Sequence, residues 1–254
     1  MEADFYNWLM VFLRLSAFLL VLPFFTMANI PVTMRVALCA LGALLMAPIL
    51  PPFPFDKLDF ISLFGVMIQE VSIGLLLGFV SRMIFFAVEL AGNIISTEMG
   101  LNMAAIFDPV EQQSSQIAGT IYVFLATVVL LTLNLHHLML LAFERTYTLL
   151  PIGSAHLNNA LFQTVVGQTS HIFMIALQIS APVIAASFVI TLVFSVLSRA
   201  VPEMNVFTEM FAFRIIGGLI VFGFTLQLSA QYVVNYLNRL PNDLLAIAQM
   251  LGEK

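Results

Sequence analysis

The chain has 254 residues, of which 61% are hydrophobic and 9% charged, and its mean hydropathy is +1.04. Soluble domains carry about 25% charged residues, so this composition cannot cover a water-soluble surface and indicates an integral membrane protein. The net charge of −5 leaves no basic face for nucleic acid. The single cysteine, Cys39, excludes an internal disulfide and a cysteine-based metal site.

The first apolar segment, residues 8–28, is long enough for a helix of about 30 Å, which crosses a bilayer. Glu2 and Asp4 precede it without a basic residue, which argues against a cleaved signal peptide. Arg14 lies about two turns inside this segment. It either snorkels to the interface or pairs with a neighbouring helix, and its depth favours pairing. Pro23 predicts a kink.

A second apolar run, residues 36–50, follows Arg35 and is short for a complete span. It ends in a cluster of prolines, which stops a helix and makes a stiff connector. The cluster consists of Pro48, Pro51, Pro52 and Pro54.

Residues 60–80 form the next predicted helix. It contains Gly74 and Gly78, a small-xxx-small pattern that lets two helix backbones approach closely. Glu70 lies four residues before Gly74 and therefore on the same face. A carboxylate on a packing face must be paired or neutralised. We favour a structural ion pair over a proton relay, because one acid makes no relay chain.

Arg82 and Glu89 follow this helix, seven residues apart and on one face, and we expect both to pair between helices. Residues 96–119 then interrupt the apolar sequence with acids, amides and hydroxyls but no Lys or Arg. Such a segment cannot lie against lipid tails. It either leaves the membrane or lines a space that is wet or buried in protein.

The second half of that polar segment has a helix-start signature. Asp108 as N-cap, Pro109 at the first helical position and Glu111 two residues later form a capping box. We therefore expect a helix to restart near Pro109 and residues 99–107 to be irregular.

Residues 117–141 are predicted to be one long apolar helix that ends in Asn134, His136 and His137. Adjacent histidines point to different faces of a helix, and no H-E-x-x-H pattern is present, so an interfacial cap is a better interpretation than a metal site. The mixed stretch that follows, residues 144–159, contains a predicted turn at residues 151–153.

Residues 161–197 would be about 55 Å long as one helix, well beyond a hydrocarbon core of about 30 Å. Two alternatives remain open: the segment folds back near residues 180–182, or it is one kinked helix that protrudes among other subunits. A charged tip, residues 199–205, precedes a returning helix, residues 206–234. The glycines assigned to packing on that helix are Gly217 and Gly218.

The C-terminal tail from Pro241 is weakly amphipathic and predicts a helix that lies on a surface or packs on a partner. Its apolar stripe consists of Leu244, Leu245, Ala248 and Leu251. Arg35, Arg82 and Arg199 are the best positive-inside markers. With Arg35 and Arg82 inside, the N-terminus lies outside.

Several stretches together resemble one known family. They are residues 13–25 with Arg14 and Pro23, residues 100–109 followed by Gln and Ser, residues 134–153, and the run Arg-x-x-Pro-x-Met-Asn-x-Phe at residues 199–207. With the chain length, they are similar to the FliR family of flagellar type III export gates, whose injectisome counterparts are called SctT. The similarity covers essentially the whole chain, and the last run is its most specific part. Residues 145–147 depart somewhat from the family pattern.

The resemblance implies an all-α, polytopic protein of long kinked helical hairpins, with a FliP-like portion at about residues 1–160 and a FliQ-like hairpin and tail at about residues 161–254. It implies a non-enzymatic subunit without a cofactor, in the bacterial inner membrane at the flagellar basal body. The implied partners are FliP, FliQ, FlhB, membrane lipid and exported unfolded flagellar proteins, with no nucleic acid. The alternative is a secondary transporter with an intramembrane relay of Glu70, Arg82, Glu89 and Glu98, but no internal repeat supports it.

Two sets of site residues follow from the resemblance. A plug would close the export channel at rest, with Phe107 as an apolar stopper that gates by dewetting. The plug residues are Met103, Phe107, Asp108, Pro109, Glu111, Gln112, Gln113, Ser114 and Ser115. A hairpin tip would contact FlhB, and its residues are Arg199, Pro202, Glu203, Met204, Asn205 and Phe207.

Overall fold

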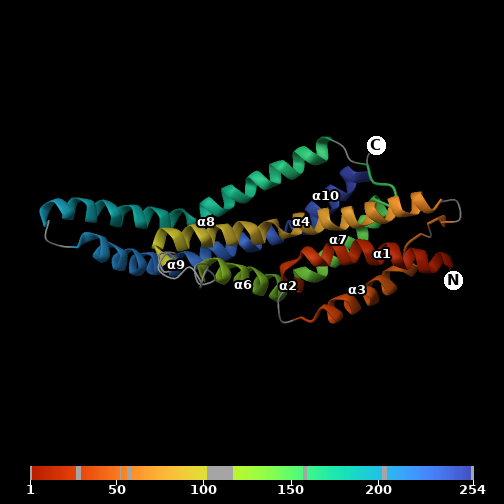
Figure 1. Cartoon of the computed structure of the whole chain (residues 1–254), viewed down its shortest axis with the longest axis horizontal. Coiled ribbons are helices and arrows are strands. Elements are labelled where there is room, and N and C mark those ends of the chain that lie inside the picture. The colour runs from red at the N-terminus through yellow and green to blue at the C-terminus, as the bar shows by residue number, and fades with distance from the viewer. Residues whose placement is uncertain are drawn as a thin grey trace. The chain divides into compact units, whose positions relative to one another are not determined.

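The computed structural model describes residues 2–26, 30–51, 53–55, 59–101, 117–156, 159–201 and 205–252. Within these ranges every regular element is a helix (Figure 1), which confirms the predicted all-α class. The helices are α1 (Glu2–Val21), α2 (Pro23–Thr26), α3 (Val32–Met46), the 3-10 turn η1 (Ala47–Ile49), α4 (Phe60–Met99), α6 (Ile117–Thr132), α7 (Leu135–Leu149), α8 (Asn159–Ala200), α9 (Val206–Leu237) and α10 (Leu240–Gly252).

The length and composition of these helices fit a multi-pass membrane protein. In the described part of the chain, five helices are long and apolar enough to cross a membrane, or up to six if α6 and α7 form one broken span. By internal contacts the chain divides into two compact units. Unit 1 comprises Met1–Met83, Leu133–Gln168 and Asn238–Lys254, and unit 2 comprises Ile84–Thr132 and Thr169–Leu237. The FliP-like and FliQ-like portions on either side of about residue 160 stay predictions.

Unit 1 is built around α1, which packs on α3, on the first part of α4 and on α7. The α1–α4 contact is close because Gly74 and Gly78 present no side chain to α1. A Cβ on Gly78 would lie 2.8 Å from the carbonyl oxygen of Phe18. On the α7 side, the rings of Phe18 and Phe143 stack with centroids 4.8 Å apart.

The amphipathic tail forms α10, which packs on α7 of the same chain. Its buried face consists of Leu240, Leu244, Ile247, Ala248 and Leu251, so the expected stripe is displaced toward Ile247, and Leu245 lies at its edge. A Cβ on Gly252 would meet the carbonyl oxygen of Leu149 at 2.6 Å. The backbone N–H of His156 also donates to the carbonyl oxygen of Leu251 at 2.9 Å.

Unit 2 contains the end of α4, α6, most of α8 and α9. Gly92 of α4 and Gly119 of α6 bring two backbones into direct contact. The hydroxyls of Tyr122 on α6 and Ser229 on α9 are hydrogen-bonded at 3.0 Å in the buried interior. On α9, Gly217 packs on Ile190 of α8 and Gly218 packs on Met99 at the end of α4.

Three of the predicted helices had wrong bounds. The first helix begins at Glu2 rather than at residue 8, and it ends at Val21, with Pro23 opening the separate short helix α2. The helix expected over residues 60–80 begins as predicted at Phe60 but continues without a break to Met99. Arg82 and Glu89 are therefore interior residues of α4, where long charged side chains are tolerated because they can reach a partner.

The third error concerns residues 117–141, which are not one helix. Asn134 adopts a left-handed conformation, with φ 54°, and separates α6 from α7. Asparagine is one of the few residues other than glycine that accept this conformation at low cost. The second helix, α7, continues to Leu149, so residues 144–149 of the expected mixed stretch are helical. The turn expected at residues 151–153 is present.

The structure decides between the alternatives for residues 161–197. They lie in α8, a single 42-residue helix with Pro182 inside it. Two residues before the proline, the hydroxyl of Ser180 donates to the carbonyl oxygen of Ala176 at 2.9 Å, a bond within its own helix. Residues 36–50 also differ from expectation, because α3 and η1 together give an apolar window of 18 residues, Val32–Ile49, long enough to span.

Candidate functional site

A buried ion pair joins α1 to α4 inside unit 1. The Arg14 guanidinium donates through Nε to Oε2 of Glu70 at 2.5 Å and through Nη2 to Oε1 at 2.9 Å. Both side chains have an exposed fraction of 0%. This two-pronged geometry is the strongest that an arginine and a carboxylate can form. Arg14 and Glu70, each expected to be in an ion pair, are thus paired with each other.

The turn that follows α7 is tied to the same pair. Arg14 Nη1 donates to the carbonyl oxygen of Leu150 at 3.1 Å. The backbone N–H of Gly153 donates to Oε1 of Glu70 at 3.2 Å. Gly153 has φ 75°, a conformation that favours glycine, and a Cβ there would lie 3.2 Å from the ring of Phe53. The charges therefore fix a loop as well as two helices.

The aromatic ring of Tyr147 on α7 covers the guanidinium. Cζ of Arg14 lies 4.1 Å from the centre of that ring, a cation–π contact. Tyr147 is itself 2% exposed, so the ring covers the guanidinium within the buried interior of unit 1. Three helices and one turn of unit 1 thus contribute to a closed cluster.

The glycine face of α4 lies directly beside this cluster. A Cβ on Gly74, one turn after Glu70, would overlap the carbonyl oxygen of Arg14. The same arginine therefore supplies its side chain to Glu70 and its backbone to Gly74. The spacing in the sequence predicted that Glu70, Gly74 and Gly78 share one face. Nothing in the sequence indicated that Tyr147 and the turn residues Leu150 and Gly153 contact Arg14 or Glu70.

Arg82 lies at the end of α1. Its Nη1 donates to the carbonyl oxygen of Val21, the last residue of α1, at 3.4 Å. A cation at this place stabilises the C-terminus of α1, because the last carbonyl groups of a helix lack partners within it. Glu89 lies in unit 2 and is half-buried, and its pairing stays a prediction.

The two motif sets that came from the family resemblance fall mostly outside the described residues. All nine plug residues do so, as do Pro202, Glu203 and Met204 of the tip. Of the remaining tip residues, Arg199 lies in the last turn of α8 with an exposed side chain. The carbonyl oxygen of Asn205 accepts the N–H of Glu209 at the start of α9. Before the plug, α4 ends at Met99, and Gly100 has φ 80° with the ring of Phe211 against it.

The paired histidines lie next to each other at the start of α7. The rings of His136 and His137 lie 4.1 Å apart at the start of α7. Among the residues that the structure describes, no group of three or more His, Cys, Asp or Glu side chains could hold a metal ion.

The fold and the buried cluster define a class: a multi-helix membrane protein in which intramembrane charge holds helices together. A family model described as "Bacterial export proteins, family 1" matches residues 5–240. The chain belongs to the bacterial export proteins, family 1.

Similar proteins from three bacteria carry the same name, flagellar biosynthetic protein FliR. The Bacillus subtilis (strain 168) protein is 30% identical over 202 residues, which are 78% of this chain and 78% of that protein. The Escherichia coli (strain K12) protein is 27% identical over 239 residues, with 94% and 91% covered. The Caulobacter vibrioides protein is 30% identical over 222 residues, with 86% and 87% covered.

Proposed function

We propose that the chain is a subunit of the flagellar type III protein export gate and helps to form and plug the channel through which unfolded flagellar proteins cross the inner membrane. The observation that carries this proposal is the family match over residues 5–240, together with full-length similarity to proteins named flagellar biosynthetic protein FliR. FliP, FliQ and FlhB homologues would be its partners. It would act as a structural component and not as an enzyme.

The geometry of unit 1 suits such a component. A channel wall must hold its shape while a polypeptide moves past it. The Arg14–Glu70 cluster fixes α1, α4 and the turn after α7 with charge-assisted hydrogen bonds, and the Gly74 contact leaves α1 no room to shift along α4. Unit 1 would therefore be a rigid frame in the assembly.

The moving part would be the plug, residues 107–115. Its polar side chains could not face lipid, and Phe107 would close the channel by excluding water. The tip residues 199–207 would face the cytoplasm and contact FlhB. Both assignments rest on the family resemblance and on residue type.

The transporter alternative is not favoured. A relay carboxylate must exchange protons, whereas both Glu70 oxygens are engaged by Arg14 and one also by Gly153. The Arg14 side chain that balances the charge of Glu70 is equally buried, so the pair would act as a structural link between α1 and α4.

Deleting the gene in its own bacterium tests the proposal. We expect flagellar proteins to remain in the cell, with export restored by the wild-type gene on a plasmid. Normal export of flagellar proteins by the deletion strain would contradict the proposed function.

A further inference from the structure

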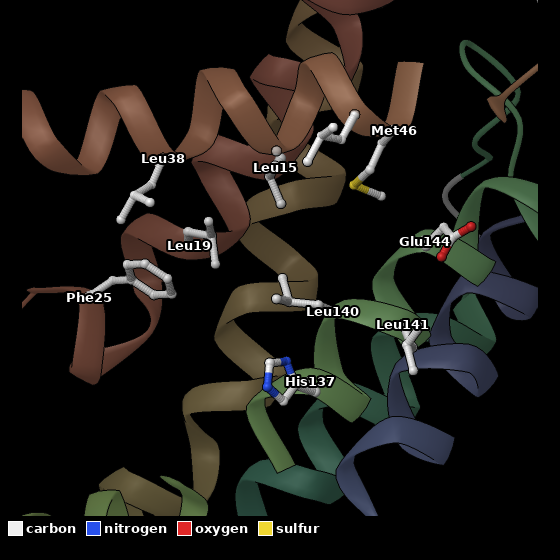
Figure 2. Close-up of a pocket in the computed structure, with 11 residues that line it drawn as sticks. Leu15, Leu19, Phe25, Leu38, Met46, His137, Leu140, Leu141 and Glu144 are labelled. Atoms are coloured by element: carbon white, nitrogen blue, oxygen red, sulfur yellow. The ribbon is translucent and has the colours of Figure 1, made fainter. Parts of the chain in front are cut away.

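Unit 1 contains an apolar cavity of about 490 Å³ between α1, α2, α3 and α7 (Figure 2). This is within the range of about 300–1,000 Å³ found for ligand sites. Aliphatic side chains from α1 and α3 face Leu140 and Leu141 across it. Two polar residues, His137 and Glu144, line it from the same face of α7.

The cavity lies beside the exposed apolar face of α3. α3 and η1 form a candidate membrane span with only 17% of its window buried. Leu41, Leu44 and Leu45 are 58%, 58% and 74% exposed on it. A molecule that enters the cavity from this side comes from an apolar medium, which selects an acyl chain over a water-soluble ligand.

The end of the cavity near Met46 and Glu144 is its interfacial end. α3 ends at Met46 and runs into the proline connector, whose Phe53 N–H donates to Asn7 at the start of α1 at 3.3 Å. The Trp8 indole reaches further in, because its Nε1 donates to the carbonyl oxygen of Ala40, six residues before Met46, at 3.1 Å. Leu38, eight residues before Met46, lies about 12 Å deeper.

Glu144 gives this interfacial end a negative charge. It is half-buried, and among the described residues it forms no ion pair. A carboxylate next to hydrocarbon requires a cation or a hydrogen-bond donor to offset its lost hydration. At the depth of the headgroups, a lipid ammonium group can supply both.

We propose that this cavity binds one acyl chain of a phospholipid with a primary ammonium headgroup, such as a phosphatidylethanolamine, and that the ammonium group donates to Glu144. A primary ammonium has N–H donors that a quaternary choline lacks, and an anionic glycerol headgroup would be repelled. The inference concerns a lipid site and does not depend on the export function.

Competition between lipids on the purified full-length chain tests the site. The chain in detergent is incubated with equal amounts of phosphatidylethanolamine, phosphatidylcholine and phosphatidylglycerol of the same acyl chains, and the bound lipids are counted by native mass spectrometry. We expect phosphatidylethanolamine to exceed phosphatidylglycerol about tenfold, the ratio for one charge-assisted hydrogen bond. Equal binding of the three lipids would overturn the proposal.

Variants at and around the carboxylate locate the preference. Glu144→Gln is expected to remove it while leaving one lipid bound, and Glu144→Asp is expected to keep it. Arg145→Gln, at the exposed neighbouring position, is the matched control and should bind like the wild type. Leu141→Trp should fill the cavity and lower total bound lipid. Thermal unfolding of each variant confirms that it is folded, and a preference that survives Glu144→Gln would refute the assignment.

A neighbouring protein segment is the competing occupant. A photo-crosslinking amino acid at position 38, in membranes that contain the native assembly, distinguishes the two. A lipid-sized adduct is expected, and an adduct to another polypeptide would overturn the proposal.

Discussion

Neutralising Glu70 tests whether the buried ion pair is a structural bridge. Glu70→Gln keeps the size of the side chain and one acceptor oxygen but removes the negative charge. The guanidinium of Arg14, which has an exposed fraction of 0%, then has no counter-charge. It also loses one of its two bonds to position 70, because Gln has a single oxygen.

The size of the effect follows from burial. Removing one partner of a buried ion pair costs about 3–5 kcal/mol. We expect the lower end, about 3 kcal/mol, because Gln can still accept from Arg14 or Gly153. For a chain of this length, such a loss lowers the unfolding midpoint by about 6–12 °C.

The assay is thermal unfolding of the full-length chain in detergent, with recovery of the assembled complex on a native gel as a second readout. Glu209→Gln is the matched control, because Glu209 is exposed in the first turn of α9. Its neutralisation should cost less than about 1 kcal/mol. Arg14→Met combined with Glu70→Gln removes both charges and should recover more than half of the loss.

Two results would refute this reasoning. One is a Glu70→Gln chain as stable as the wild type. The other is a double variant less stable than Glu70→Gln, since that would make the arginine stabilising without its partner. Normal assembly with abolished proton dependence of export would instead favour a relay.

Three further predictions concern packing, the plug and the tip. Gly74→Ala should lower the unfolding midpoint because the new Cβ overlaps the Arg14 backbone. Gly65→Ala on the same helix, where a Cβ would have no atom within 4 Å, should leave the midpoint unchanged or raise it. Equal shifts for the two variants would contradict the close contact. Deleting residues 107–115 should make the membrane leaky to small ions with assembly largely intact, and an unchanged ion conductance would remove the plug role. Glu203→Cys should crosslink to FlhB in living cells, and the absence of crosslinks at every tip position would exclude that contact.

The need for an ion pair was visible in the sequence, but the partners were not. Arg14 and Glu70 each lie in an apolar helix, where an isolated charge is too costly. They are 56 residues apart, and helix periodicity alone does not say which faces meet. Two of the remaining partners are backbone groups, the carbonyl oxygen of Leu150 and the N–H of Gly153, which every sequence contains.

Helix existence was predicted better than helix length. Apolar runs revealed the helices, and the glycine pattern revealed the face of α4 that meets α1. The break at Asn134 was hidden because apolar residues continue on both sides of it, and one left-handed residue is enough to end a helix. The unbroken course of α4 past Val80 was hidden for the opposite reason, since charged residues suggested an end where Arg82 reaches the last carbonyl group of α1.

The central claim is that the chain is a subunit of the flagellar export gate. Its most direct test is mass spectrometry of the intact complex after mild detergent extraction of the tagged, full-length chain from its own bacterium. We predict that FliP and FliQ homologues co-purify with it in a single assembly. A chain recovered alone or only with itself, under conditions in which FliP and FliQ homologues stay assembled with each other, would contradict the claim.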